Sequence, residues 1–154
     1  MATITYAQAF IDGLYSMMAE DPYMNVIGHE LVGTGSQAHC DEKLMHDFHD
    51  RIADLPTSER AVGALGVGAA MAGQHMFVHF GNASFALEAW NQFINEAAPA
   101  HYMSGGKVSV PVTFHMSHGI RGGGAPQHSI TPQAMFANCP GLEVVMPGAP
   151  QDVK

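Results

Sequence analysis

The sequence predicts an α/β protein, a three-layer α/β/α domain with a mainly parallel sheet. Short segments rich in Val, Ile and Phe alternate along the chain with segments whose apolar residues follow helical spacing. Strands separated by helices are typical of parallel sheets that are covered on both faces. The 154 residues, 47% of them apolar, are enough for one domain with a sizeable core.

The N-terminal half is expected to contain three helices and three strands. A helix is predicted over residues 5–22, where apolar side chains recur every three or four positions and Pro22 ends the pattern. A short strand around 26–28 precedes an amphipathic helix over 40–52 and a second short strand over 51–56. Ser58 can cap a helix that runs to Gly73. A compact strand follows at residues 75–80.

The C-terminal half is expected to continue the alternation. Residues 84–100 predict a helix with a broad buried face, made of Phe85, Leu87, Ala89, Trp90, Phe93 and Ile94. Residues 107–116, rich in Val and Thr, give the clearest strand, and a Gly-rich loop follows. A short helix over 131–141 and a last strand over 142–148 complete the pattern. Pro150 and Asp152 then look like the first turn of another helix. A single turn is not stable alone, so we expect the sequence to be part of a longer chain rather than to end in a frayed turn.

Charge and cysteine content exclude several classes of function. The net charge is −8 with only six Lys and Arg, so a nucleic-acid or anionic-membrane partner is not expected. Cys40 and Cys139 form no C-x-x-C motif, and the N-terminus lacks the pattern of a signal peptide. The longest apolar run, residues 61–73, is too short and too glycine-rich to span a bilayer. These features predict a cytoplasmic protein.

Three weaker motifs have simpler interpretations. "GTGSQA", residues 33–38, matches a loose dinucleotide-binding fingerprint, but the following "HCDE" favours a plain turn. His46 and His49, like His115 and His118, have a spacing that metal sites use. No carboxylate or thiol set completes either pair, which favours surface or packing roles for these histidines. The sequence contains no Gly-x-Ser-x-Gly motif of a hydrolase.

Glu59 stands at the head of a helix that contains no other acid. The thirteen residues after Arg60 are Ala, Gly, Val, Leu and Met only. An acid in the first turn complements the helix dipole, which is the simple interpretation. The small residues also allow another backbone to pack closely, and a carboxyl group that loses water there can share or donate a proton. Spacing alone leaves both interpretations open.

Six motifs, in this order, give the sequence a family resemblance: "DLPTSE", "GVGAAMAG", "NQFINEAAPAHYMSGGK", "VPVTF", "APQHS" and "CPGLEVVMPGAPQDVK". Together they resemble the pyrimidine-binding domain of the beta subunit of thiamine-diphosphate-dependent 2-oxoacid dehydrogenases. That group includes the pyruvate, branched-chain and acetoin enzymes, and transketolase has a related domain. The resemblance implies that residues 1–154 form a pyrimidine-binding domain that is truncated before a C-terminal transketolase-type domain.

The resemblance also implies site residues. Glu59 would bond a ring nitrogen of the cofactor's aminopyrimidine, and Phe85 would lie on that ring. His128 would lie by the substrate and take part in acyl transfer. Glu88 is expected beside the cofactor, although the family commonly has Gln there. From spacing alone, Phe85 could equally be a core residue and His128 a solvated loop residue.

Other positions depart from the family pattern. His79 stands where the family usually has Glu, Asn91 where it has Asp, and His115 where it has Arg. The segment "HFGNASF" departs from the usual aromatic-rich one. These positions border the cofactor and the substrate channel in the family, so the departures bear on substrate identity and activity.

The resemblance implies a beta-type component of an enzyme that decarboxylates a 2-oxoacid or cleaves a 2-hydroxyketone. The sequence has no Gly-Asp-Gly motif, which holds the Mg²⁺ that bridges the cofactor's phosphate oxygens. Thiamine diphosphate would therefore be shared with an alpha-type subunit that carries the Mg²⁺, and beta chains would pair within a heterotetramer. The alternatives are a diverged, non-catalytic assembly domain and, on residues 33–38 alone, a nucleotide-binding domain.

Overall fold

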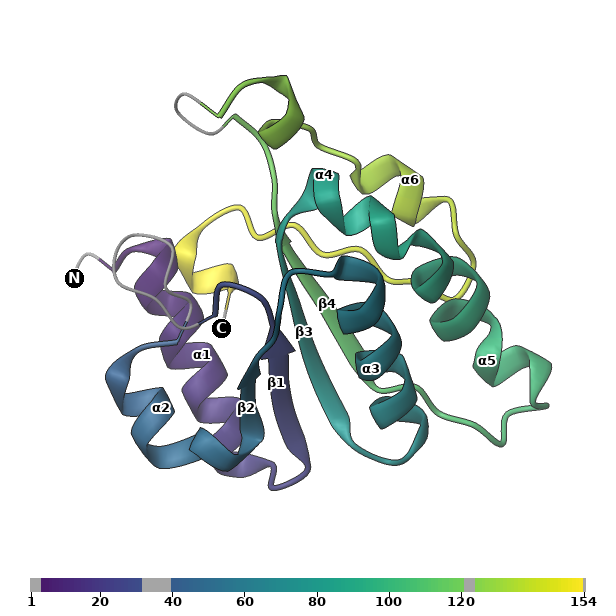
Figure 1. Cartoon of the computed structure of the whole chain (residues 1–154), viewed down its shortest axis with the longest axis horizontal. Coiled ribbons are helices and arrows are strands. Elements are labelled where there is room, and N and C mark those ends of the chain that lie inside the picture. Colours follow the sequence, from purple (N-terminus) through teal and green to yellow (C-terminus); the bar gives the residue numbers. More distant parts are fainter. Residues whose placement is uncertain (1–3, 32–39, 121–123, 154) are drawn as a thin grey trace.

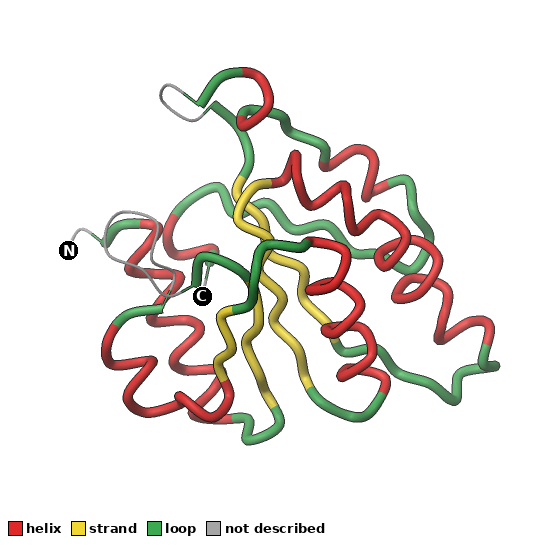
Figure 2. Tube along the Cα trace, viewed as in Figure 1, coloured by secondary structure: helices red, strands yellow, loops and turns green. Residues whose placement is uncertain are grey.

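A four-stranded, all-parallel sheet forms the middle layer of the domain (Figures 1 and 2). The computed structural model describes residues 4–31, 40–120 and 124–153. The strand order is β2-β1-β3-β4. The bounds are β1 (Met24–Gly28), β2 (Ile52–Asp54), β3 (His75–Asn82) and β4 (Val112–Ser117). The predicted α/β class and parallel sheet are therefore confirmed.

Helices cover both faces of this sheet (Figure 1). One side carries α1 (Tyr6–Glu20) and α2 (Glu42–Phe48), which continues into the turn η1 (His49–Arg51). The other side carries α3 (Glu59–Met71), α4 (Ala83–Ala86), η2 (Leu87–Ala89), η3 (Gln92–Ala97), α5 (Ala98–Met103) and α6 (Gln133–Ala137). Two further turns are η4 (Pro126–His128) and η5 (Pro150–Asp152), and η5 contacts α1. The three-layer prediction holds.

Strand β3 divides the interior into two cores. Successive side chains of a strand point to opposite faces of the sheet. Phe77 packs with α1, α2 and β1, whereas Val78 and Phe80 pack beneath α3 and the helices that follow β3. Val78 and Phe80 are fully buried. The compact apolar strand predicted at residues 75–80 is therefore the central partner of both helical layers.

His79 and His115 face each other within the sheet, under α1. They are register partners on β3 and β4, and their Nδ1 atoms lie 2.7 Å apart. Phe10 of α1 stacks on the His115 ring with the centroids 4.6 Å apart. His79 is fully buried. Two of the predicted departures from the family pattern thus form one aromatic cluster in the layer between the sheet and α1.

Two predictions about local structure are wrong, and a third gives the wrong start for a strand that is present. Residues 142–148 form no strand, and Val145 is 78% exposed. An apolar β-branched segment forms a strand only where a neighbouring strand pairs with it. Ser58 is the N-cap residue of α3, but its side chain makes no capping hydrogen bond. The predicted strand over 107–116 begins only at Val112, after Pro111, which lacks an N–H to donate.

Phe85 is exposed rather than buried, with 39% of its surface accessible. The predicted helix over 84–100 is a succession of α, 3-10, π and α turns, from α4 through η2 and η3 to α5. These turns differ in residues per turn, so the buried face does not keep a 3.6-residue period. Phe93 and Ala89 stay fully buried, while Phe85 points out of the core.

Candidate functional site

The predicted site residues lie around one edge of the sheet. In a parallel sheet the carboxyl ends of all strands meet at the same edge, where α/β proteins bind ligands. His29 follows β1 directly, Glu59 begins the helix after β2, and Asn82 ends β3 and caps α4. Helices α3 and α4, which follow β2 and β3, contact each other. Their places beside the sheet can be followed in Figure 1.

Glu59 is paired with a histidine that sequence reasoning missed. Its Oε1 lies 3.7 Å from Nε2 of His29, and the two side chains are 13% and 6% exposed. Neither ring nitrogen of His29 makes a hydrogen bond within the described residues. His29 lies against Gly81, where a Cβ would come within 3.3 Å of the ring. One feature of the sequence could have indicated His29: it directly follows a buried strand, where parallel sheets bind ligands.

Phe85 and His128 are brought into direct contact. Their ring centroids lie 5.0 Å apart with an interplanar angle of 84°, an edge-to-face arrangement. His128 belongs to η4, which follows the Gly-rich loop, whereas Phe85 belongs to α4. Because Phe85 is exposed, its ring is accessible to a ligand as well as to His128.

Asn82 and Ser84 join the His128 turn to the start of α4. Asn82 Nδ2 donates to the carbonyl oxygen of His128 at 3.2 Å. Asn82 Oδ1 accepts from Ser84 N at 3.0 Å, and Ser84 Oγ lies within hydrogen-bonding distance of both Asn82 Oδ1 and the Gln127 carbonyl. Sequence reasoning singled out neither residue, although both lie in the segment "HFGNASF".

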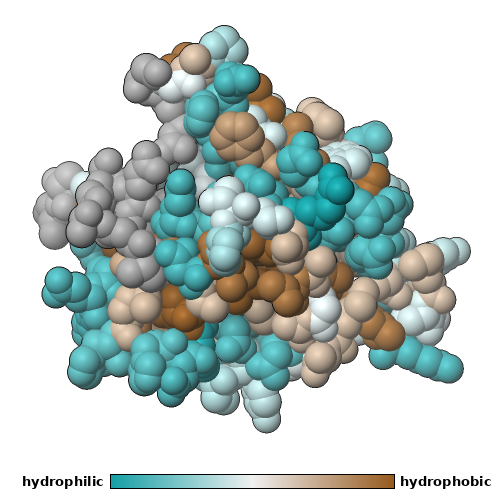
Figure 3. Space-filling model, viewed as in Figure 1, coloured by the Kyte–Doolittle hydropathy of each residue, from teal (hydrophilic) through white to brown (hydrophobic). Residues whose placement is uncertain are grey.

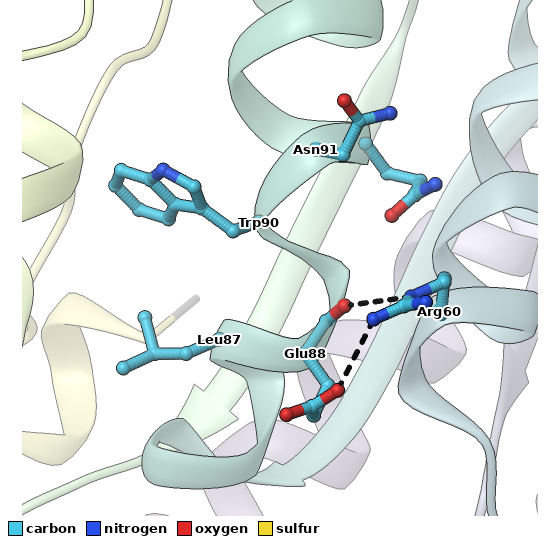
Figure 4. A pocket seen from close by; sticks show the side chains of 6 residues that line it. Arg60, Leu87, Glu88, Trp90 and Asn91 are labelled. Atoms are coloured by element: carbon cyan, nitrogen blue, oxygen red, sulfur yellow. Dashed lines mark hydrogen bonds and ion pairs between the residues drawn. The ribbon is translucent and has the colours of Figure 1, made fainter.

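Glu88 lines a surface hollow of about 410 Å³ together with Arg60, Leu87 and Trp90 (Figure 4). Arg60 Nη2 donates to Glu88 Oε2 at 3.3 Å, and Arg60 Nε donates to the Glu88 carbonyl at 3.4 Å. Both side chains are about 70% exposed, at 71% and 69%. The pair connects the first turn of α3 to η2. A cofactor-binding role for Glu88 stays a prediction.

The outer face of α3 is apolar and uncovered. Ala61, Ala64, Leu65, Gly68 and Met71 are all exposed, Leu65 by 57%. The space-filling view shows an apolar area over this part of the molecule (Figure 3). The opposite face of α3, with Val62, Gly66 and Ala70, packs on the sheet.

The other motifs singled out in the sequence, the histidine pairs and "GTGSQA", contribute no further candidate site among the described residues. Within the described ranges, no three His, Cys, Asp or Glu side chains come together to hold a metal ion. His46 and His49 pair with the neighbouring Asp47 and Asp50 on the surface. The motif "GTGSQA" lies outside the described residues. No helix in the described part of the chain has the length and apolar character needed to cross a membrane.

Comparison with known proteins decides the family. The family model described as the transketolase pyrimidine-binding domain matches residues 2–154. This chain belongs to that family. The chain is therefore a transketolase-type pyrimidine-binding domain, as the six motifs predicted.

Relatives of this pyrimidine-binding domain include beta subunits of pyruvate dehydrogenase. The pyruvate dehydrogenase E1 component subunit beta of Bos taurus is 36% identical over 152 residues, which cover 98% of this chain and 42% of that protein. The corresponding subunit of Rhizobium meliloti is 36% identical over 155 residues, covering 100% of this chain and 34% of that protein. The chain thus spans less than half the length of these relatives.

A solved structure supports the same fold. The chain matches a structure described as a split gene transketolase, an inactive beta4 tetramer, with a TM-score of 0.73 and 18% identity. The match covers 99% of this chain and 46% of that chain. The three-layer α/β/α arrangement is therefore the pyrimidine-binding fold of this family.

Proposed function

We propose that this chain forms the aminopyrimidine-binding half of a thiamine diphosphate site. The enzyme would be a thiamine-diphosphate-dependent 2-oxoacid dehydrogenase E1 of the beta type, or one that cleaves a 2-hydroxyketone. The observation that carries the proposal is the position of Glu59 and Phe85. The Glu59 side chain is 13% exposed and Phe85 is 39% exposed. They lie on α3 and α4, two helices that contact each other and that follow the carboxyl ends of β2 and β3, where α/β proteins bind ligands.

The chemistry of these two side chains fits a flat heteroaromatic ring. A carboxyl group can donate to or accept from a ring nitrogen, and an exposed phenyl ring can stack on an aromatic face. When bound, thiamine diphosphate supplies a carbon nucleophile and an electron sink. The role of Glu59 is to hold a proton at the ring nitrogen, with the His29 ring beside its Oε1 limiting how the carboxyl group turns.

His128 is the residue of this chain that would move a proton near the substrate. An imidazole changes charge between pH 5 and 8, which suits proton transfer under physiological conditions. Its contact with Phe85 supports a position next to the ring-binding residue. Glu88, on the surface with Arg60, would contact the cofactor only from the rim of the site.

The remaining half of the site would come from another chain. We expect an alpha-type subunit to carry the diphosphate and Mg²⁺, and a second beta chain to complete the assembly. The uncovered apolar face of α3 supports such contacts, because exposed apolar surface of this kind marks protein interfaces. The two free cysteines, Cys40 and Cys139, support a reducing compartment such as the cytoplasm.

Co-expression with an alpha-type subunit of this enzyme class tests this function. Cofactor binding is measured by calorimetry, and exchange of the cofactor's C2 proton by NMR, for the wild type, Glu59→Gln and Glu88→Gln. Glu59→Gln should keep assembly but slow the exchange by about 10²- to 10⁴-fold, the usual contribution of an acid–base residue. Glu88→Gln should change it little, because the Glu88 side chain is 69% exposed and pairs with Arg60. Fast exchange in Glu59→Gln would refute the role of Glu59.

A non-catalytic assembly domain is the alternative function. The structurally similar split gene transketolase, an inactive beta4 tetramer, favours it. Under this alternative the chain would form oligomers, measured by light scattering, yet no combination with an alpha-type chain would bind thiamine diphosphate. Cofactor binding by any such complex would rule the alternative out.

A further inference from the structure

A cluster of polar groups around Asn82 lies at the end of β3. Asn82 is only 6% exposed, and its side chain joins three backbone or side-chain groups. A buried amide needs hydrogen-bond partners for its donors and acceptors, because each group left without a partner destabilises the folded protein. The partners of Asn82 belong to two segments that are distant in sequence, the start of α4 and the turn that carries His128.

The chemistry of the partners fixes the orientation of the Asn82 amide. The backbone N–H of Ser84 can only donate, so the amide oxygen must face it. The carbonyl of His128 can only accept, so the amide NH₂ must face that group. One side chain therefore caps α4 and holds the backbone of His128 at the same time.

Ser84 adds a second link to the same turn. Its hydroxyl oxygen lies near both Asn82 Oδ1 and the carbonyl of Gln127, the residue before His128. The turn is itself closed by bonds to Ala125, whose carbonyl accepts from His128 N at 3.2 Å and from Ser129 Oγ at 2.9 Å. Residues 125–129 are thus linked by their own hydrogen bonds, and the carbonyls of Gln127 and His128 in that turn contact Ser84 and Asn82 at the start of α4.

The end of β3 is shaped to present Asn82 to this turn. The register with β4 shifts between His79 and Asn82, and Gly81 adopts a positive φ of 66°. Such a bulge bends the strand and redirects the side chain that follows it. A Cβ at Gly81 would also lie 3.3 Å from His29 Cε1. The lack of a side chain at Gly81 therefore leaves room for His29, the partner of Glu59.

We propose that Asn82 and Ser84 are positioning residues that hold the His128 ring against Phe85. This inference rests on the proposed function for the catalytic consequence, since His128 is the proton-transferring group there. The segment "HFGNASF" departs from the aromatic-rich family pattern at these positions. In this chain, hydrogen bonds to the backbone of residues 127 and 128 fix the turn.

Asn82→Asp is the decisive variant. The carboxylate keeps the volume and still accepts from Ser84 N, but its second oxygen meets the His128 carbonyl, so an attractive contact becomes a repulsive one. Ser84→Ala removes only the hydroxyl, and Ser84→Thr restores it. Asp41→Asn is the matched control, because Asp41 caps α2 by accepting from Leu44 N at 2.8 Å, far from the site in sequence and on the opposite helical layer.

The first measurement is the NMR spectrum of the His128 ring in the full chain. In the wild type the ring current of Phe85, 5.0 Å away and edge to face, should displace the chemical shifts of the His128 ring protons. Asn82→Asp and Ser84→Ala should lose most of this shift, whereas Ser84→Thr and Asp41→Asn should keep it. An unchanged His128 signal in both Asn82→Asp and Ser84→Ala would overturn the proposal, whatever their activity.

The second measurement is steady-state kinetics of the complex with the alpha-type chain. Asn82→Asp should lower kcat by about 10- to 100-fold with little change in KM, because a displacement of about 1 Å at a reacting group has effects of that size. A kcat equal to the wild type, with the His128 signal lost, would overturn the positioning role. If the wild-type complex is inactive while the NMR signals respond as expected, the proposed function is wrong. The positioning of His128 by Asn82 and Ser84 is then still supported.

Discussion

Replacing Gly66 with alanine should destabilise the domain, whereas the same change at Gly68 should stabilise it. Both glycines lie on α3, two positions apart and on different faces. A Cβ at Gly66 would come within 2.3 Å of Val78 Cγ2, but a Cβ at Gly68 would meet nothing within 4 Å. The two substitutions are chemically identical, so the packing of α3 on β3 alone separates them.

The magnitudes follow from these distances. Carbon atoms in good contact lie about 3.5–4.0 Å apart, so Gly66→Ala requires α3 and Val78 to separate by about 1.2–1.7 Å. Val78 is fully buried and β-branched, so its side chain has no free rotamer to adopt. Overpacking typically costs about 1–3 kcal/mol, and the buried Val78 places this site in the upper part of that range, about 2–3 kcal/mol. The helix propensity of Ala over Gly offsets about 1 kcal/mol of this cost. We expect a net loss of about 1–2 kcal/mol for Gly66→Ala and a gain of about 1 kcal/mol for Gly68→Ala.

Urea unfolding of the chain, followed by circular dichroism, gives both free energies of unfolding. The slopes should stay equal, so that the midpoints alone report stability. Because Glu59 begins α3, Gly66→Ala should also weaken thiamine diphosphate binding by the assembled enzyme. A Gly66→Ala variant as stable as Gly68→Ala would refute the close packing of α3 on Val78 and the account of the small residues.

Three further predictions concern other parts of the molecule. Arg51→Met should lower the free energy of unfolding by about 2–3 kcal/mol, because the guanidinium donates to backbone carbonyls around the end of α1. Urea unfolding measures this loss, and a value below about 0.5 kcal/mol would contradict the prediction. The carbonyls are those of Met18, Asp21 and Met24. The hydrogen bonds from the His46 ring and the Tyr15 hydroxyl lower the pKa of Asp47 to about 2, so the stability they provide is present above about pH 4 and is lost as the pH falls toward 2. Asp47→Asn should flatten the stability–pH curve in that window, and an NMR titration of Asp47 near pH 4 would contradict the prediction. Burial raises the pKa of Cys40 to about 11, so a thiol reagent at pH 8 should label Cys139 and leave Cys40 unmodified until the chain unfolds, as mass spectrometry can check.

The elements that the sequence predicted well are those with strong local signals. Helix α1 has regular apolar spacing and a Thr5 cap that accepts from Gln8 N, and β3 is a compact apolar run. The last predicted strand failed because pairing is a property of two segments. Residues 142–148 have strand-like composition, yet no neighbouring strand pairs with them.

In the site, too, local motifs were predictable from the sequence and contacts between distant segments were not. Glu59, Phe85 and His128 were singled out through motifs, and their positions on α3, α4 and η4 agree with the strand–helix alternation. The exposure of Phe85 was not predictable from a helical period, because the helix after β3 changes from α to 3-10 to π geometry. His29 was missed because its partner, Glu59, belongs to another βα unit.

By itself, the sequence determined the fold class, the family and the identity of the candidate site residues, because each depends on local patterns and motifs along the chain. Tertiary structure alone decided which of those residues meet. It paired Glu59 with His29, set Phe85 edge to face with His128, and attached the His128 turn to Asn82 and Ser84. The physical reason is that a parallel sheet gathers the ends of separate strands at one edge, where contacts depend on strand order and register rather than on sequence distance.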